Sequence, residues 1–197
     1  MRIGVDIDGV LTNDDDYILD HAIKFCYEHN LNSYVDPYLY ETRKFDWDFD
    51  ILEAYREEYF WNYVIHEPPR KFASEVLQKL VQEGHEIYII TSRHLTTRDS
   101  AEGQKMRNMI IDWLRNYHIP YNELFFSKDK TVEIDKLKLD IIIEDSPETI
   151  PSFVKYTHVF CYDCRYNCDL NISNMTRVFS WYDIYRKIKN MEFTKEI

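Results

Sequence analysis

The sequence predicts an α/β fold, a three-layer sandwich in which helices cover both faces of a mainly parallel sheet. Two observations support this prediction: short apolar runs recur along the chain, and segments with helical spacing of apolar residues separate them. That alternation is typical of parallel strands joined by helical crossovers. The expected strands are residues 3–7, 86–90, 124–126, 139–143 and 158–162. With 197 residues, the chain can form one large core together with a small accessory unit.

Two apolar stripes between the later strands indicate amphipathic helices. The first stripe, which precedes Gly84, consists of Phe72, Val76, Leu77, Leu80 and Val81. The second consists of Met106, Met109, Ile110, Trp113, Leu114 and Tyr117. Spacings of three and four residues place each set on one face of a helix, and the glycine supplies a C-terminal stop. We expect both stripes to belong to the core.

One stretch breaks this alternation. Residues 13–69 follow the first strand and contain no clear buried strand, although a crossover needs only about a dozen residues. Apolar spacing predicts helices over residues 16–29 and 51–64. We therefore divide the chain into an α/β core, residues 1–12 and 70–197, and a helical cap, residues 13–69.

The expected cap contains two groups of residues whose roles the sequence leaves open. Phe45, Trp47 and Phe49 alternate with acids, and they could form either the core of a small unit or a surface that stacks on a ligand. Asp14, Asp15 and Asp16 could bind a metal. We expect instead a solvated acidic run that opens a helix and interacts favourably with its dipole.

Composition disfavours several classes of partner. Lys and Arg number 24 against 35 Asp and Glu, so the net charge is 24 − 35 = −11, which disfavours nucleic-acid polymers and anionic membranes. No apolar run approaches the ~20 residues of a membrane helix, and the N-terminus leads directly into a strand, without the pattern of a signal peptide. We expect a cytoplasmic protein. A small phosphorylated metabolite remains admissible as its partner, because a bound divalent cation inverts the local field. The sequence does not indicate an oligomeric state.

The first expected strand ends in the segment V-D-I-D-G-V-L, which contains two acids. The carboxyl ends of parallel strands form the ligand crevice of such a sheet, so Asp6 should point into it. Gly9 permits the turn that brings Asp8 towards the same point. One carboxylate, Asp6, can attack phosphorus to form an acyl-phosphate. The other, Asp8, can protonate the leaving group and then deprotonate water.

Polar residues follow the other expected strands at the same edge of the sheet. Thr91 and Ser92 suit phosphate oxygens, and Lys130 would stabilise the charge of the nucleophile and of the phosphate. Glu144 and Asp145 follow the fourth strand. Mg²⁺ favours one or two carboxylates together with substrate phosphate and water. Asp6, Asp145 and the backbone carbonyl of Asp8 would hold it.

Together these residues resemble the four motifs of the haloacid dehalogenase superfamily of phosphohydrolases. The matching segments are Asp6-x-Asp8-Gly9, Thr91-Ser92, Lys130 and Glu144-Asp145. Within that superfamily, D-I-D-G-V-L, S-K-D-K-T-V and I-I-I-E-D are similar to the 5′(3′)-deoxyribonucleotidases and their bacterial relatives. The resemblance implies a Rossmann-like core, Asp6 as nucleophile, Asp8 as acid/base, Thr91 for phosphate, Lys130 for charge, Asp145 as metal ligand and Glu144 in the outer shell.

The sequence departs from that pattern at one position. In the deoxyribonucleotidases a base-stacking Phe ends the segment D-G-V-L-A-D-F, whereas here the segment reads D-G-V-L-T-N-D and ends at Asp14. Dehalogenases proper lack the second acid of this motif. The presence of Asp8 therefore favours phosphoryl chemistry over halide displacement. We expect a Mg²⁺-dependent phosphomonoesterase that acts on (deoxy)nucleoside 5′-monophosphates. A sugar-phosphate phosphatase and a catalytically silent phosphate-binding module are the alternatives.

Overall fold

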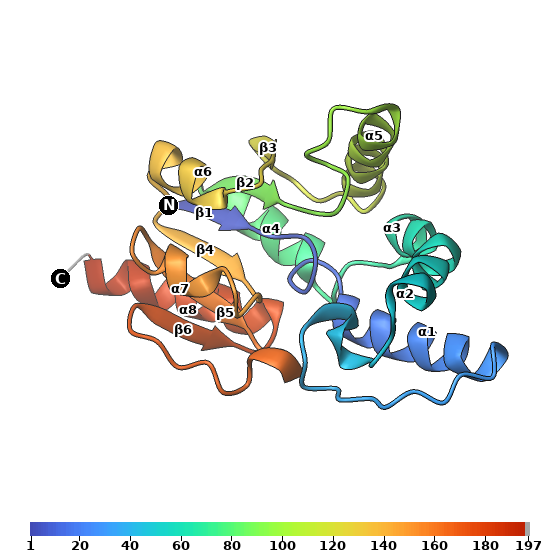
Figure 1. The fold of residues 1–197 in the computed structure, drawn as a ribbon. Helices are drawn as coiled ribbons and strands as arrows, with labels where there is room; N and C mark the ends of the chain where they lie inside the picture. The colour runs from blue at the N-terminus through green and yellow to red at the C-terminus, as the bar shows by residue number, and fades with distance from the viewer. Residues whose placement is uncertain (196–197) are drawn as a thin grey trace.

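The computed structural model describes residues 1–195, with side chains to residue 191, and contains a parallel sheet of six strands (Figure 1). The strands lie in the order β3-β2-β1-β4-β5-β6. Their bounds are β1 Arg2–Val5, β2 Glu86–Thr91, β3 Glu123–Phe126, β4 Ile141–Glu144, β5 His158–Tyr162 and β6 Met175–Val178. The predicted α/β class and the parallel sheet are confirmed, and the ends of the five expected strands lie within two residues of the predicted ones.

Helices cover both faces of the sheet, because its central strands are apolar on both sides. One face packs against α4 (Ala73–Gln82), α5 (Ala101–Asn116) and α8 (Trp181–Lys195). The other packs against α6 (Lys130–Leu137) and α7 (Ile150–Phe153). The predicted three layers are therefore confirmed.

The central strands alternate their side chains between two apolar cores. Ile141 and Ile143 of β4 belong to the core beneath α4, α5 and α8, whereas Ile142 belongs to the core beneath α6 and α7. Gly4 of β1 lies opposite Ile142, and a Cβ atom at Gly4 would lie 2.6 Å from Leu139 Cδ1. A glycine here allows the second core to pack closely against the sheet.

Strand β6 was not expected from the sequence. Its residues M-T-R-V contain only one fully buried side chain, that of Val178, and it pairs with β5 at the edge of the sheet. An edge strand with few buried side chains has no run of apolar residues by which the sequence could predict it.

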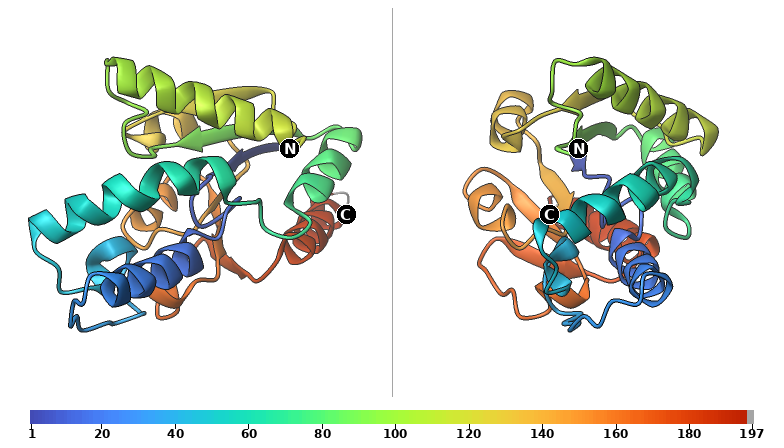
Figure 2. Two further views of the ribbon diagram at one scale, coloured as in Figure 1. Left: turned by 90° about the vertical axis from the view of Figure 1, so that its right-hand side faces the viewer. Right: turned by 45° about the vertical axis from the view of Figure 1, so that its right-hand side comes forward.

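The inserted segment is helical and lies beyond the carboxyl ends of the strands, at the right of Figure 1. It contains α1 (Asp14–Glu28), the short helix η1 (Glu41–Lys44), and a continuous helical rod made of α2 (Phe49–Tyr55), the π-helical turn η2 (Arg56–Phe60) and α3 (Trp61–His66). Figure 2 shows α1 and this rod together on one side of the molecule. Both predicted helices are present, and each begins two residues earlier than expected. The division into core and cap stays a prediction.

The expectation of a solvated acidic run at the start of α1 is wrong for two of its three residues. Asp14 and Asp15 are buried, and only Asp16 is exposed. Asp15 forms ion pairs with Lys44 Nζ and with Arg165 Nη2, each at 2.8 Å. Lys44 itself is 1 % exposed and also donates to the Leu39 carbonyl at 2.6 Å. Cations from distant segments, which a local reading cannot detect, therefore compensate the burial of Asp15.

No helix among the described residues is long and apolar enough to span a bilayer.

We predict that Lys44→Met lowers the free energy of unfolding by about 3 kcal/mol, because it leaves part of a buried ion network uncompensated. Chemical denaturation of the variant and the wild type measures this difference. Lys24→Met is the control, since Lys24 is an exposed lysine of α1, and it should change stability by less than about 0.5 kcal/mol. Equal stabilities of Lys44→Met and the wild type would contradict the account.

Candidate active site

The ends of four elements bring the predicted catalytic residues together. Asp6 directly follows β1, Thr91 ends β2, Glu144 ends β4, and Lys130 begins α6. Lys130 Nζ lies 2.8 Å from Asp6 Oδ1 and 2.8 Å from Glu144 Oε2. Its own side chain is 4 % exposed. The lysine therefore holds two acids from neighbouring strands at one buried point.

Asp6, Glu144 and Asp145 form a cluster in which one ligand oxygen of each lies within 4.8 Å of the others. Glu144 is already satisfied, because Oε2 accepts from Lys130 and Oε1 accepts the backbone N–H groups of Asp145 and Ser146 at 3.1 and 3.2 Å. Asp145 differs: Oδ2 accepts the Tyr166 hydroxyl, but the buried Oδ1 has no hydrogen-bond partner among the described residues.

The charges of this cluster favour a cation. Burial and the negative charge of Glu144 raise the pKa of Asp6 well above its usual value, even against Lys130. The same two causes raise the pKa of Asp145. Asp145 keeps an oxygen without a partner, and the raised pKa values of Asp6 and Asp145 show that both acids resist ionisation. A hard divalent cation would fit this cluster, because it would supply the missing positive charge.

Gly9 allows the backbone to pass close to this cluster. Its φ is +75°, and a Cβ atom there would lie 2.1 Å from Asp145 Oδ2 and 2.8 Å from the Tyr166 hydroxyl. A side chain at this position would displace the acid, so glycine is required both by the turn and by the close approach.

Asp8 is held by an arginine and by a tyrosine of the insertion. Arg93 Nε donates to Asp8 Oδ2 at 2.9 Å, Arg93 Nη2 donates to Oδ1, and the Tyr63 hydroxyl donates to Oδ1 at 2.6 Å. Burial alone would raise the pKa of Asp8, but Arg93 and these hydrogen bonds outweigh it and hold that pKa below its usual value. The pKa values of Asp6 and Asp8 are therefore shifted in opposite directions.

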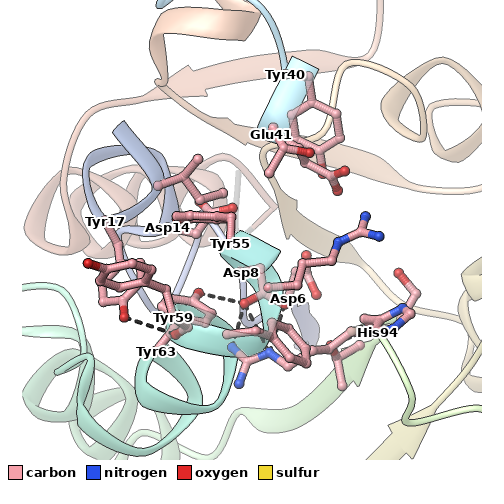
Figure 3. A pocket seen from close by; sticks show the side chains of 17 residues that line it. Asp6, Asp8, Asp14, Tyr17, Tyr40, Glu41, Tyr55, Tyr59, Tyr63 and His94 are labelled. Carbon is pink, nitrogen blue, oxygen red and sulfur yellow. Dashed lines mark hydrogen bonds and ion pairs between the residues drawn. The ribbon is translucent and has the colours of Figure 1, made fainter. Parts of the chain in front are cut away.

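A cavity of about 370 Å³ opens over these residues (Figure 3). Asp6, Asp8, Thr91 and Ser92 line it from the sheet side. The aromatic residues that line it all come from the insertion, namely Tyr17, Tyr40, Tyr55, Tyr59, Phe60 and Tyr63. Its remaining polar lining is Asp14, Glu41, Thr42, Arg56, Arg93 and His94.

The three aromatic residues suspected from the sequence do not line this cavity. Phe45 and Trp47 stack on each other with ring centres 4.5 Å apart, and Trp47 also packs on Phe25 and Tyr55. Phe49 is 71 % exposed. The interpretation as the core of a small unit is therefore correct for Phe45 and Trp47. The spacing of four residues between Tyr55, Tyr59 and Tyr63 would have indicated the aromatic face that does line the cavity.

Arg93, Tyr63 and Asp14 are site residues that the sequence interpretation missed or undervalued. Arg93 is buried and paired with Asp8. Asp14 lines the cavity at 7 % exposure. Burial, with the charges of Asp8 and Asp15, raises the pKa of Asp14 to about 7.

Comparisons with known proteins show which family this chain is similar to. The model of the family "5′ nucleotidase, deoxy (Pyrimidine), cytosolic type C protein" matches residues 1–193. A candidate nucleotidase of Bacillus cereus is 27 % identical over 202 residues, which cover 95 % of this chain and 99 % of that protein. A candidate 5′(3′)-deoxyribonucleotidase of Chlorobaculum tepidum is 32 % identical over 117 residues, 59 % of this chain and 54 % of that protein.

Solved structures show the same fold at low sequence identity. A haloacid dehalogenase family hydrolase of Deinococcus radiodurans, with bound phosphate and sodium, superposes with a TM-score of 0.63 over 96 % of this chain and 95 % of that chain, at 14 % identity. A candidate β-phosphoglucomutase of Thermotoga maritima gives a TM-score of 0.59 over 96 % and 98 %, at 12 % identity. The predicted resemblance to the haloacid dehalogenase superfamily is confirmed.

The chain therefore belongs to the family of 5′ nucleotidases, deoxy (pyrimidine), cytosolic type C, and it is a phosphoric monoester hydrolase of the 5′-nucleotidase type.

Proposed function

We propose that the protein hydrolyses nucleoside 5′-monophosphates in a Mg²⁺-dependent reaction through an aspartyl-phosphate on Asp6. The observation that carries the proposal is the buried cluster at the strand ends. Lys130 bridges Asp6 and Glu144 at 2.8 Å each, and Asp145 keeps an oxygen without a partner beside them. Asp6 of this cluster lines a cavity that also has aromatic residues in its lining.

In the first step, a carboxylate oxygen of Asp6 attacks phosphorus and the ester P–O bond breaks. The leaving alkoxide takes a proton from Asp8, which then stands as a carboxylate. In the second step, Asp8 accepts a proton from water, and the water oxygen attacks the phosphorus of the aspartyl-phosphate. Inorganic phosphate leaves and Asp6 is regenerated.

The surrounding residues stabilise the charge that develops in both steps. The ammonium group of Lys130 contacts Asp6 directly, so it offsets the charge of the nucleophile and of the phosphate oxygens. Thr91 and Ser92 line the cavity and can donate their hydroxyl groups to phosphate. Mg²⁺ held by Asp6, Asp145 and the backbone carbonyl of Asp8 would supply the positive charge that keeps these acids ionised beside phosphate.

Aromatic walls favour a nucleoside as the leaving group. Tyr17, Tyr59 and Tyr63 come from two helices of the insertion and line the same cavity as the catalytic acids. Flat aromatic faces can stack on a base, at about 0.5–1.5 kcal/mol per pair. A sugar-phosphate phosphatase is the rival, and a panel of nucleoside and sugar monophosphates distinguishes the two.

The nucleophile can be tested by Asp6→Asn. We predict that turnover of a nucleoside monophosphate falls by more than a hundredfold, because an amide cannot form the acyl-phosphate. Steady-state assays give the rate, and circular dichroism checks that the fold is kept. Asp50→Asn, at an exposed acid outside the site, should keep the wild-type rate. An Asp6→Asn rate above about a hundredth of wild type would exclude the covalent mechanism.

The metal requirement can be tested by chelation. We predict that EDTA abolishes activity, that Mg²⁺ restores it, and that Ca²⁺ inhibits because it prefers a looser and higher coordination. Asp145→Ala should raise the Mg²⁺ concentration needed for half-maximal activity by at least tenfold, since it removes a proposed ligand. Full activity after exhaustive chelation would contradict the assignment of Asp6, Asp8 and Asp145 to a metal site.

The effect of Arg93 on Asp8 can be tested by the pH dependence of kcat/KM. Asp8 must be protonated to act as an acid, and Arg93 lowers its pKa, so the protonated fraction falls as pH rises. Arg93→Gln removes this cause, raises the pKa of Asp8, and should move the basic limb of the profile for a nucleotide to higher pH.

An aryl phosphate is the matched control substrate, because its leaving group needs no proton and its profile should not move in the same way. Arg98→Gln is the matched control variant, since Arg98 is an exposed arginine of the same loop. A basic limb that stays in place, or moves to lower pH, in Arg93→Gln would contradict the role given to this ion pair.

A further inference from the structure

Tyr166 is a buried residue beside the proposed metal ligands, and the proposed reaction does not use it. It lies in the short helix η3 (Arg165–Asn167), which follows β5, and its hydroxyl donates to Asp145 Oδ2. The other oxygen of this carboxylate, Oδ1, is buried and has no partner among the described residues. Within the part of the chain that the structure describes, Tyr166 therefore supplies the one hydrogen bond that the carboxylate accepts.

This hydrogen bond limits how the carboxylate of Asp145 can turn. Rotation about the bond between Cβ and Cγ moves both oxygens, so an untethered carboxylate must lose rotational freedom when it binds a metal. The bond from Tyr166 to Oδ2 restricts that rotation before a metal binds, and it leaves Oδ1 available to a cation. Groups that orient a metal ligand in this way contribute roughly 10–100-fold to metal affinity.

The next residue along the chain fixes the position of Tyr166 relative to Asp145. Asn167 is 1 % exposed, and its Nδ2 donates to the backbone carbonyl of Asp145 at 2.7 Å and to that of Tyr162 at 2.8 Å. Its Oδ1 accepts the backbone N–H of Cys164 at 3.1 Å. These bonds tie η3 to the residue that follows β4 and to the end of β5, so they hold the tyrosine beside the acid.

Two residues of the insertion contact the ring of Tyr166. The ring of Tyr40 packs edge-on against it, with ring centres 4.9 Å apart. Lys44 Nζ lies 5.0 Å from the centre of the Tyr166 ring. A ring with neighbours on its own turn and on the insertion has little freedom to swing, so the direction of its hydroxyl is fixed as well.

We propose that Tyr166 is a positioning residue that orients Asp145 for the divalent cation. Asp145 would contact the metal, and Tyr166 would act on metal affinity through Asp145. The inference rests on the proposed function, because it concerns the Mg²⁺ site of the proposed reaction.

The test measures Mg²⁺ affinity without turnover, by calorimetric titration of the metal-free protein. Tyr166→Phe keeps the ring and removes only the hydroxyl, so we expect the dissociation constant for Mg²⁺ to rise by about tenfold or more. Circular dichroism in EDTA checks that the metal-free variant is folded.

Tyr88→Phe is the matched control variant. Tyr88 is also buried, and its hydroxyl also donates to a carboxylate, that of Glu86. Glu86 begins β2, at the opposite end of that strand from Thr91 and the site. The control therefore loses the same kind of hydrogen bond away from the metal, and it should keep the wild-type dissociation constant.

A second readout separates the orientation of a metal ligand from general damage to the site. With a nucleoside monophosphate as substrate, Tyr166→Phe should need about tenfold more Mg²⁺ for half-maximal activity. At saturating Mg²⁺ its kcat should stay within about threefold of wild type, because an excess of metal fills the weakened site by mass action.

The outcomes distinguish failure of this inference from failure of the proposed function. Equal Mg²⁺ dissociation constants for Tyr166→Phe and wild type would overturn the inference and leave the proposed metal site intact. Equal weakening in Tyr88→Phe, or a lower kcat at saturating Mg²⁺ with unchanged Mg²⁺ affinity, would overturn the inference too. If wild type binds no Mg²⁺, then the metal site of the proposed function is itself wrong, and the inference fails with it.

Discussion

The contact of Lys130 with Asp6 and Glu144 is the interaction on which the rest of the site depends. It joins the ends of β1 and β4 to the first residue of α6 at a point almost closed to solvent. Three charges in such a place are tolerable only because they compensate one another. The arrangement still leaves an excess of acid, since Asp145 lies beside it with an oxygen that no described group satisfies. That imbalance makes the site a place for a cation and for the phosphate that accompanies it.

The two acids of the Asp6-x-Asp8 segment have opposite electrostatic environments, although they are two residues apart. Burial and Glu144 raise the pKa of Asp6, whereas Arg93 and Tyr63 hold the pKa of Asp8 down. A cation beside Asp6 and Asp145 would lower the pKa of Asp6, and the proposed attack on phosphorus requires Asp6 to be a carboxylate. Tyr63 belongs to the insertion, so the state of the proposed acid/base depends on how the insertion sits over the sheet.

The sequence predicts the parts of the site that strand ends position, because one topological rule links them. Apolar runs identify the strands, and parallel strands bring their carboxyl ends to one edge, so Asp6, Thr91 and Asp145 could be placed together before the structure. The same rule explains why strand β6 was missed: its M-T-R-V segment at the sheet edge buries too little apolar surface to give a signal.

Contacts between distant segments could not be predicted in this way. Arg93 and Asp8 are 85 positions apart, and nothing in either local sequence specifies that they pair. Asp15 looked solvated because its compensating cations, Lys44 and Arg165, come from other segments. The sequence left open whether Phe45, Trp47 and Phe49 contact a ligand. The tyrosines at helical spacing in the following rod line the cavity instead. Composition identifies aromatic residues, but only the packing of α1 against that rod decides which of them face a ligand.

The most direct test of the covalent mechanism is to isolate the intermediate. Asp8→Asn should slow the second step, which needs a base, while an aryl phosphate needs no acid in the first step. Acid-quenched Asp8→Asn enzyme should therefore carry phosphate, and peptide mass spectrometry should locate it on Asp6. The Asp6→Asn/Asp8→Asn double variant should carry none. Phosphate at another residue, or Asp8→Asn enzyme that turns over without any phosphorylated Asp6, would contradict the account.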